Sequence, residues 1–93
     1  MIRPDEICEM VVLVNRRGLH ARAAARFVRE ASRYDAEIHV AKEEMRVSGH
    51  SIMGLMMLAA PKGTRVQLCV AGPQAAEALG ALSDLVRRGF DED

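Results

Sequence analysis

Hydrophobic and polar positions along the chain follow two different periods, and these separate strands from helices. Residues 36–40 and 64–71 alternate with a period of two, as expected for strands with one buried face. Residues 8–14 are apolar and β-branched apart from Glu9, and residues 45–47 form a short candidate partner strand. The alternation places these side chains on the inner face: Ala36, Ile38, Val40, Val66, Leu68 and Val70. It places Arg65, Gln67 and Cys69 on the outer face.

Three other segments have helical spacing. Residues 21–34 carry apolar side chains on one face and four arginines largely on the others. Residues 51–58 predict a short helix, with Ser51 suited to cap its start, and Pro61-Lys62-Gly63 ends it. Gly72-Pro73 is expected to open the last helix with proline in its first turn, and Gly89 to cap its end. Its apolar stripe consists of Ala75, Ala78, Leu79, Leu82, Leu85 and Val86.

The predicted order is strand–helix–strand–strand–helix–strand–helix, within one domain that spans residues 1–93. Helices with one apolar face each, together with short strands, indicate a mixed sheet covered on one side. The acidic tail Asp91-Glu92-Asp93 is expected to be frayed.

Composition excludes some classes of function. Thirteen Lys and Arg residues balance thirteen Asp and Glu residues, so the basic excess of a nucleic-acid binder is missing. The amino terminus has no apolar stretch of signal-peptide length and no run reaches the length of a membrane span, which favours a cytoplasmic protein without membrane insertion. Cys8 and Cys69 are too few for a disulfide framework, and their apolar surroundings favour buried thiols in a reducing compartment.

The candidate chemistry lies between the first predicted strand and the first predicted helix. There His20 follows Gly18 at the point where the helical pattern begins. A helix start presents unpaired backbone N–H groups and a partial positive charge, so it attracts anions. A phosphate carried on this imidazole would be received by that start. The positive surroundings also favour the uncharged, nucleophilic imidazole.

Three arginines lie near His20 in the sequence, and they are expected to have two different roles. Arg22 is expected to donate charge-assisted hydrogen bonds to phosphate oxygens; otherwise it is a solvated arginine on an arginine-rich helix. Arg16 and Arg17 are expected to steer an acidic partner toward the histidine more than to touch the phosphate.

The short helix offers a second candidate region. Ser51 is either simply a helix cap or a regulatory phosphorylation site, where added negative charge would weaken the docking of an acidic partner. The apolar residues after it cannot all face inward from one short helix. We expect Leu55 and Leu58 to be buried, and Ile52, Met53 and Met56 to form an exposed docking patch.

The segments Gly18-Leu19-His20-Ala21-Arg22-Ala23 and Ser51-Ile52-Met53-Gly54-Leu55-Met56 resemble those of HPr, the family of histidine phosphocarriers of the bacterial phosphotransferase system. The resemblance implies an α+β open-faced β-sandwich (βαββαβα), with a four-stranded antiparallel sheet covered on one face by three helices. It implies that His20 accepts a phosphoryl group on Nδ1 from Enzyme I, which draws on phosphoenolpyruvate. The carboxyl-terminal part is similar to the nitrogen-related, NPr-like branch.

The same resemblance implies a set of partners. His20 would pass its phosphoryl group to an enzyme IIA-type acceptor, and the protein would be a substrate of phosphotransferase enzymes, not an enzyme itself. Ser51 would be the substrate of an HPr kinase/phosphorylase, and a regulatory target is a further expected partner.

Two other functions stay open at this point. A ligand-sensing α/β regulatory module would bind a small molecule, and an interaction protein would use the methionine-rich helix beside a vestigial histidine. No cofactor is implied. His39 and His50 lack metal-ligand spacing with each other or with the cysteines, and His39 is expected to be solvated, so no metal site is predicted.

Overall fold

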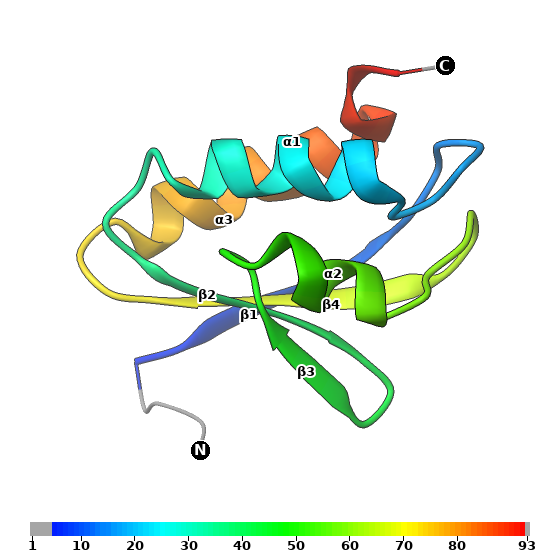
Figure 1. Ribbon diagram of the computed structural model, residues 1–93. Coiled ribbons are helices and arrows are strands. Elements are labelled where there is room, and N and C mark those ends of the chain that lie inside the picture. The colour runs from blue at the N-terminus through cyan, green and yellow to red at the C-terminus, as the bar shows by residue number, and fades with distance from the viewer. Residues whose placement is uncertain (1–4, 93) are drawn as a thin grey trace.

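The four predicted strands and three predicted helices are present in a computed structural model that describes residues 5–92 (Figure 1). The elements are β1 (Ile7–Val12), α1 (Ala21–Ala31), β2 (Glu37–Lys42), β3 (Met45–Ser48), α2 (Ile52–Met57), β4 (Arg65–Ala71) and α3 (Ala75–Arg87). A short 3₁₀ helix, η1 (Gly89–Asp91), follows α3. Within residues 5–92, no helix has the length and apolar character that would let it cross a membrane.

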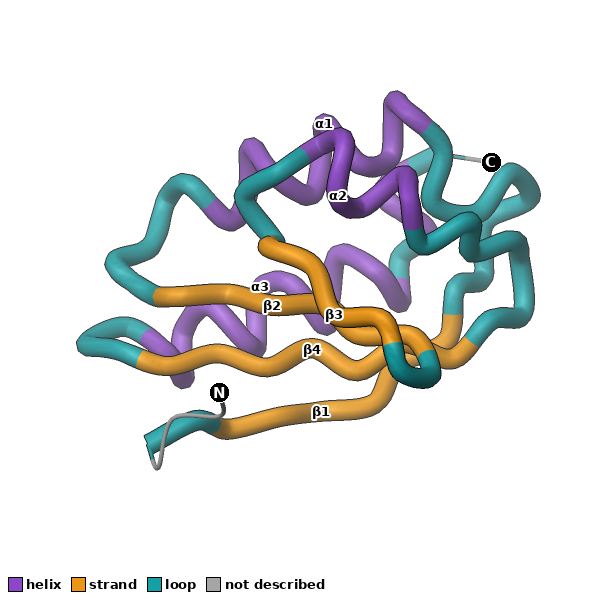
Figure 2. Tube along the Cα trace, turned by 60° about the horizontal axis from the view of Figure 1, so that its bottom comes forward, coloured by secondary structure: helices purple, strands orange, loops and turns teal. Residues whose placement is uncertain are grey.

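The strands form one sheet in the order β1-β4-β2-β3, and its three ladders are all antiparallel. The mixed sheet expected from the strand pattern is therefore wrong, and the antiparallel sheet implied by the family resemblance is confirmed. All three helices lie on one side of the sheet and leave the other side open (Figures 1 and 2). The architecture is the open-faced β-sandwich.

The core lies between the sheet and the helices. Ile38 and Val40 of β2 pack with Leu68 and Val70 of β4 against the apolar faces of α1 and α3. Phe27 of α1 is the largest side chain that is fully buried. Burial of apolar surface at about 25 cal/mol per Å² supplies most of the stability, so the strand and helix periodicities determine the fold.

Several helix and strand ends differ by a few residues from the predicted ones. β1 ends at Val12, because Leu13 bonds instead to the turn before β4: its N–H donates to Thr64 O, and its carbonyl accepts from Gly63 N. Pro73 lies in the turn before α3 rather than in its first turn, and Gln74 takes the N-cap position. Gly89 follows α3 with a φ of +67°, as a helix-ending glycine does.

The two cysteines depart from the prediction. Cys8 of β1 and Cys69 of β4 are directly opposed across the ladder, with their Cα atoms 4.1 Å apart, and they form a disulfide. The expectation of two buried thiols is wrong because the antiparallel pairing brings residues 61 positions apart in sequence into side-chain contact. The bond lies on the open face of the sheet, where Cys69 is covered and Cys8 is exposed.

Gly18 fixes the path of the chain into α1. Its φ of +64° lies in the left-handed region, and a Cβ atom there would approach the Ala60 carbonyl oxygen to 2.3 Å. Next to it, the Leu19 N–H donates to the same carbonyl at 2.9 Å. Only glycine allows this close contact between the 15–20 loop and the segment after α2.

We therefore predict that Gly18→Ala lowers the free energy of unfolding by about 2–4 kcal/mol, because it adds a left-handed backbone penalty to a steric clash. Gly63→Ala is the matched control, since Gly63 has a φ of +91° but open space around its Cα. The control substitution should cost only the backbone penalty, about 1–2 kcal/mol. Urea unfolding of both variants measures the difference. Equal losses would show that the contact with Ala60 is unimportant.

Candidate functional site

His20 occupies the N-cap of α1. Its backbone is extended (φ −81°, ψ −178°), and its carbonyl accepts the first helical hydrogen bond from Ala24 N at 2.8 Å. The ring nitrogen Nδ1 accepts a hydrogen bond from the backbone N–H of Arg22 at 3.3 Å. Histidine therefore performs the capping role that serine or aspartate usually has, with Nδ1 directed at the helix start.

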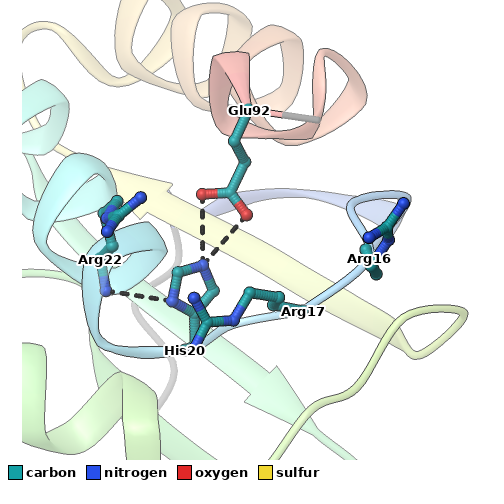
Figure 3. A pocket seen from close by; sticks show the side chains of 5 residues that line it. All are labelled: Arg16, Arg17, His20, Arg22 and Glu92. Carbon is teal, nitrogen blue, oxygen red and sulfur yellow. Dashed lines mark hydrogen bonds and ion pairs between the residues drawn. The ribbon is translucent and has the colours of Figure 1, made fainter.

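The other ring nitrogen contacts the end of the chain. His20 Nε2 lies 3.0 Å and 3.2 Å from the two carboxylate oxygens of Glu92, and the Asn15 side-chain amide donates to the same carboxylate at 2.8 Å. Asn15 Nδ2 also donates to Gly18 O, so the loop and the tail share one donor. Figure 3 shows the imidazole held between the Glu92 carboxylate and the backbone nitrogen of Arg22.

These contacts assign the proton on the ring. An ionised carboxylate only accepts hydrogen bonds, so Nε2 must carry the hydrogen that Glu92 accepts. Because the Arg22 N–H donates to Nδ1, this second nitrogen carries the lone pair in the neutral ring. The network thus leaves Nδ1 as the nucleophilic nitrogen of the uncharged imidazole.

The acidic tail is ordered around the site, so the expectation of a frayed tail is wrong for residues 91 and 92; Asp93 lies outside the described residues. Asp91 accepts hydrogen bonds from Arg88 at 2.8 Å and from Arg26 of α1 at 3.1 Å. The hydrogen bond from Arg88 holds the pKa of the Asp91 carboxyl below its ordinary value. These ion pairs place Glu92 over the start of α1.

Competing effects act on the pKa of the Glu92 carboxyl. Partial burial acts to raise its pKa. The hydrogen bonds from Asn15 and His20, with the positive charge of Arg22, outweigh this, so the pKa of Glu92 lies below its ordinary value. The carboxylate is therefore ionised at neutral pH and remains an acceptor for His20.

The residues predicted around His20 do come together. A pocket of about 200 Å³ is lined by Arg16, Arg17, His20, Arg22 and Glu92. We call it the anion pocket, because it combines three guanidinium groups with a single carboxylate. Arg16 and Arg17 come from the loop before α1 and Arg22 from its first turn, so two separate elements supply the positive charge (Figure 3). Such an arrangement can bind a dianion such as phosphate.

Ser51 and the apolar residues after it lie on α2, which packs against α1. Ser51 is the N-cap, with its hydroxyl oxygen accepting from Gly54 N at 2.9 Å. Leu55 and Leu58 are buried, as expected. The exposed side chains form what we call the methionine surface, which includes Met57 in addition to the three predicted residues: Ile52, Met53, Met56 and Met57.

The remaining histidines lie away from the anion pocket. His50 is exposed, and its Nε2 lies 3.3 Å from Ala36 O. His39 is not simply solvated as expected, since its Nδ1 is buried and lacks a hydrogen-bond partner. Glu6, Cys8 and Cys69 are the only group of three metal-ligating side chains that converge within residues 5–92, and the two sulfurs are joined in the disulfide.

Two contributors to the site, Glu92 and Asn15, were missed from the sequence. Glu92 lies 72 residues after His20, and nothing in the sequence pattern indicates that the chain end returns to α1. Asn15 is buried, with 3% of its surface exposed, although it sits in a polar loop. The sequence does not indicate that Asn15 is buried, because its burial depends on where the Gly18 carbonyl lies in space.

Comparisons with known proteins agree on one family. The family model "PTS HPr component phosphorylation site" matches residues 7–88. The phosphocarrier protein HPr of Neisseria meningitidis is 48% identical over 84 residues, covering 90% of this chain and 94% of the relative. The phosphocarrier protein NPr of Klebsiella oxytoca is 37% identical over 86 residues, covering 91% and 96%.

A solved structure shares the fold as well as the sequence. The crystal structure of HPr-C-His from Thermoanaerobacter tengcongensis has a TM-score of 0.89 and 39% identity. The match covers 94% of this chain and 98% of that one. The NPr-like character expected from the sequence is matched by relatives of that name, and relatives named HPr match over a similar share of the chain.

The Glu92 contacts predict a pH-dependent contribution to stability. Because the carboxyl pKa is lowered on folding, its contribution is complete above pH 4.5 and is lost as the pH falls through the folded-state pKa. Glu92→Gln should therefore lower the free energy of unfolding by about 1 kcal/mol at pH 6 and by much less at pH 3. Urea unfolding at both pH values measures this. Glu44→Gln, at an exposed position in the β2–β3 turn, is the control. If the wild type were still more stable than Glu92→Gln by the same free energy of unfolding at pH 3, the ionised Glu92 carboxylate would not be the source of the effect.

Proposed function

The chain belongs to the HPr family of phosphocarrier proteins of the phosphotransferase system, and on that basis we propose that His20 carries the phosphoryl group. A phosphocarrier accepts and passes on this group as a substrate of other enzymes and does not itself act as a catalyst. The assignment to His20 depends on one observation above all. Its Nδ1 is an imidazole nitrogen with a free electron pair at a helix start, within a pocket lined by three arginines.

Acceptance of the phosphoryl group follows from this geometry. The Nδ1 lone pair attacks phosphorus while the bond between phosphorus and the donor breaks, and the donor leaves with that electron pair. The phosphoryl group then replaces the lone pair that Arg22 N contacted, so that N–H is freed to donate to a phosphate oxygen. The Arg22 side chain supplies charge-assisted hydrogen bonds to the remaining oxygens.

Glu92 has a role on the opposite side of the ring. As Nδ1 forms its bond to phosphorus, the ring acquires positive charge, and the hydrogen on Nε2 becomes more acidic. The Glu92 carboxylate, 3.0 Å away, stabilises this charge without needing to take the proton. A protonated phosphoimidazole is also a good leaving group, so the same contact keeps the phosphoryl group transferable to an acceptor.

The proposed partners follow from the family and from the surface. The family acts with enzymes of the phosphotransferase system. We assign Enzyme I as the donor and an enzyme IIA-type protein as the acceptor, in the cytoplasm, where phosphoenolpyruvate is made. Arg16 and Arg17 would attract an acidic partner surface, and the methionine surface of α2 would pack against it.

We expect Enzyme I and labelled phosphoenolpyruvate to place an acid-labile phosphoryl label on His20. His20→Ala should abolish the label, and Arg22→Ala should slow its appearance by about tenfold or more, through loss of oxygen contacts. His50→Ala is the matched control and should be labelled like the wild type. Acid quenching at timed intervals and peptide mapping measure both the rate and the position. Label that survives in His20→Ala would refute the assignment.

Ser51 is the proposed regulatory phosphorylation site, with an HPr kinase/phosphorylase as its modifying enzyme. A phosphate on Ser51, which is partly buried at the start of α2, would add close to two negative charges beside the methionine surface. The same partner that is drawn to Arg16 and Arg17 would then be repelled from α2. A regulatory target would instead recognise the phosphorylated form.

Ser51→Asp should therefore slow phosphoryl acceptance from Enzyme I by about tenfold, because like charges weaken docking by one to two kcal/mol. Ser51→Ala is the matched control. It loses the hydrogen bond to Gly54 N and about 1 kcal/mol of stability, but it should accept phosphate at the wild-type rate. Initial rates at Enzyme I concentrations below saturation measure the effect. Equal rates for the two variants would exclude electrostatic regulation at this position.

A further inference from the structure

The disulfide lies on the open face of the sheet, and neither of its cysteines lines the anion pocket. Its two cysteines differ sharply in accessibility, because Cys69 is 1% exposed while Cys8 is an exposed residue. We propose that Cys8 is a site of reversible thiol–disulfide exchange with low-molecular-weight thiols of the glutathione class, and that Cys69 is its resolving cysteine.

The sheet order determines which sulfur can be attacked. A thiolate attacks a disulfide sulfur along the line of the S–S bond, on the side opposite the leaving sulfur. Cys8 lies on β1, an edge strand bonded only to β4 (Figure 2), so a small thiol can approach it from beyond the sheet edge. Cys69 lies on the inner strand β4, between Cys8 of β1 and its register partner His39 of β2, which is partly buried.

Glu6 lies beside both sulfurs. Its carboxylate lies within 4.8 Å of both sulfurs, and its side chain is only 4% exposed. It forms an ion pair with Arg46 of β3, so the two side chains span the open face above the inner strands. This pair adds to the cover over the inner strands, although the carboxylate also lies 4.0 Å from Cys8 Sγ. Its negative charge also disfavours the Cys8 thiolate, which shifts the balance from the reduced pair toward the closed disulfide.

The exchange balances without any further reagent. An external thiolate forms a bond to Cys8 Sγ, and the bond to Cys69 breaks with its electron pair on Cys69, which then takes a proton. A second external thiolate releases the oxidised disulfide of the small thiol and leaves both cysteines reduced. In the reverse direction Cys8 attacks the oxidised small molecule, and Cys69 then displaces it from Cys8.

Opening the disulfide would loosen the attachment of β1 to β4 and leave the position of His20 unchanged. The disulfide links residues 61 positions apart and fastens a strand whose side chains are mostly exposed. The loop that carries His20 has its own anchors, from Leu13 N to Thr64 O and from Leu19 N to Ala60 O. Phosphoryl acceptance at His20 should therefore persist in both redox states. The exchange proposal can fail or hold independently of the proposed function.

The test uses oxidised wild-type protein in excess reduced glutathione, quenched by acid at intervals and mapped by peptide mass. The mixed disulfide should lie on Cys8, with about tenfold or greater preference over Cys69. Cys69→Ser and Cys8→Ser, each treated with oxidised glutathione, should show the same preference between the single thiols. The mapping of the wild type needs no substitution, so an unfolded variant would not obscure the answer.

A second pair of variants tests whether the negative charge of Glu6 slows the modification of Cys8. In the Cys69→Ser background, Glu6→Gln should speed modification of Cys8 several-fold, while Glu44→Gln, in the exposed β2–β3 turn, should not. Equal modification of both cysteines, or preference for Cys69, would overturn the proposal. It would also be overturned if reduced protein supplied with Zn²⁺ held the metal on both thiols and failed to reoxidise.

Discussion

The orientation of one imidazole ring depends on hydrogen bonds at both of its nitrogens. Arg22 N donates to Nδ1 from the first turn of α1, and Glu92 accepts from Nε2 at the end of the chain. Each contact alone would leave the ring free to rotate or to change its tautomer. Together they select one neutral form, with its electron pair facing the arginines. Phosphoryl transfer needs this form, because a protonated Nδ1 cannot attack phosphorus.

The remainder of the fold keeps the groups around this ring in place. Packing of α1 on the sheet through Phe27 sets the position of the helix start. The contact of Gly18 and Leu19 with Ala60 sets the loop that enters it. The ion pairs of Asp91 with Arg88 and Arg26 return the tail to α1. All of these contacts lie on the helix side of the sheet or at its end, and the disulfide lies on the opposite face.

Periodicity sufficed to predict most of the fold, because the buried face of each strand and helix is encoded locally. The positions of Ile38, Val40 and Leu55 in the core follow from it directly. The motif around Gly18 and His20 likewise predicted the helix start and its arginine, since these neighbours are close in sequence. The contacts that were missed join distant positions: Glu92 to His20, and Cys8 to Cys69. These depend on strand order and on the path of the tail, which no local pattern specifies.

The central claim concerns which ring nitrogen is free, and nitrogen-15 NMR of the His20 ring tests it most directly. Spectra of the unmodified and phosphorylated protein report the protonation and phosphorylation of each nitrogen separately. The account predicts a neutral ring with hydrogen on Nε2 before transfer, and phosphorus bonded to Nδ1 afterwards. Hydrogen on Nδ1 in the unmodified neutral ring, or phosphorus on Nε2, would contradict it.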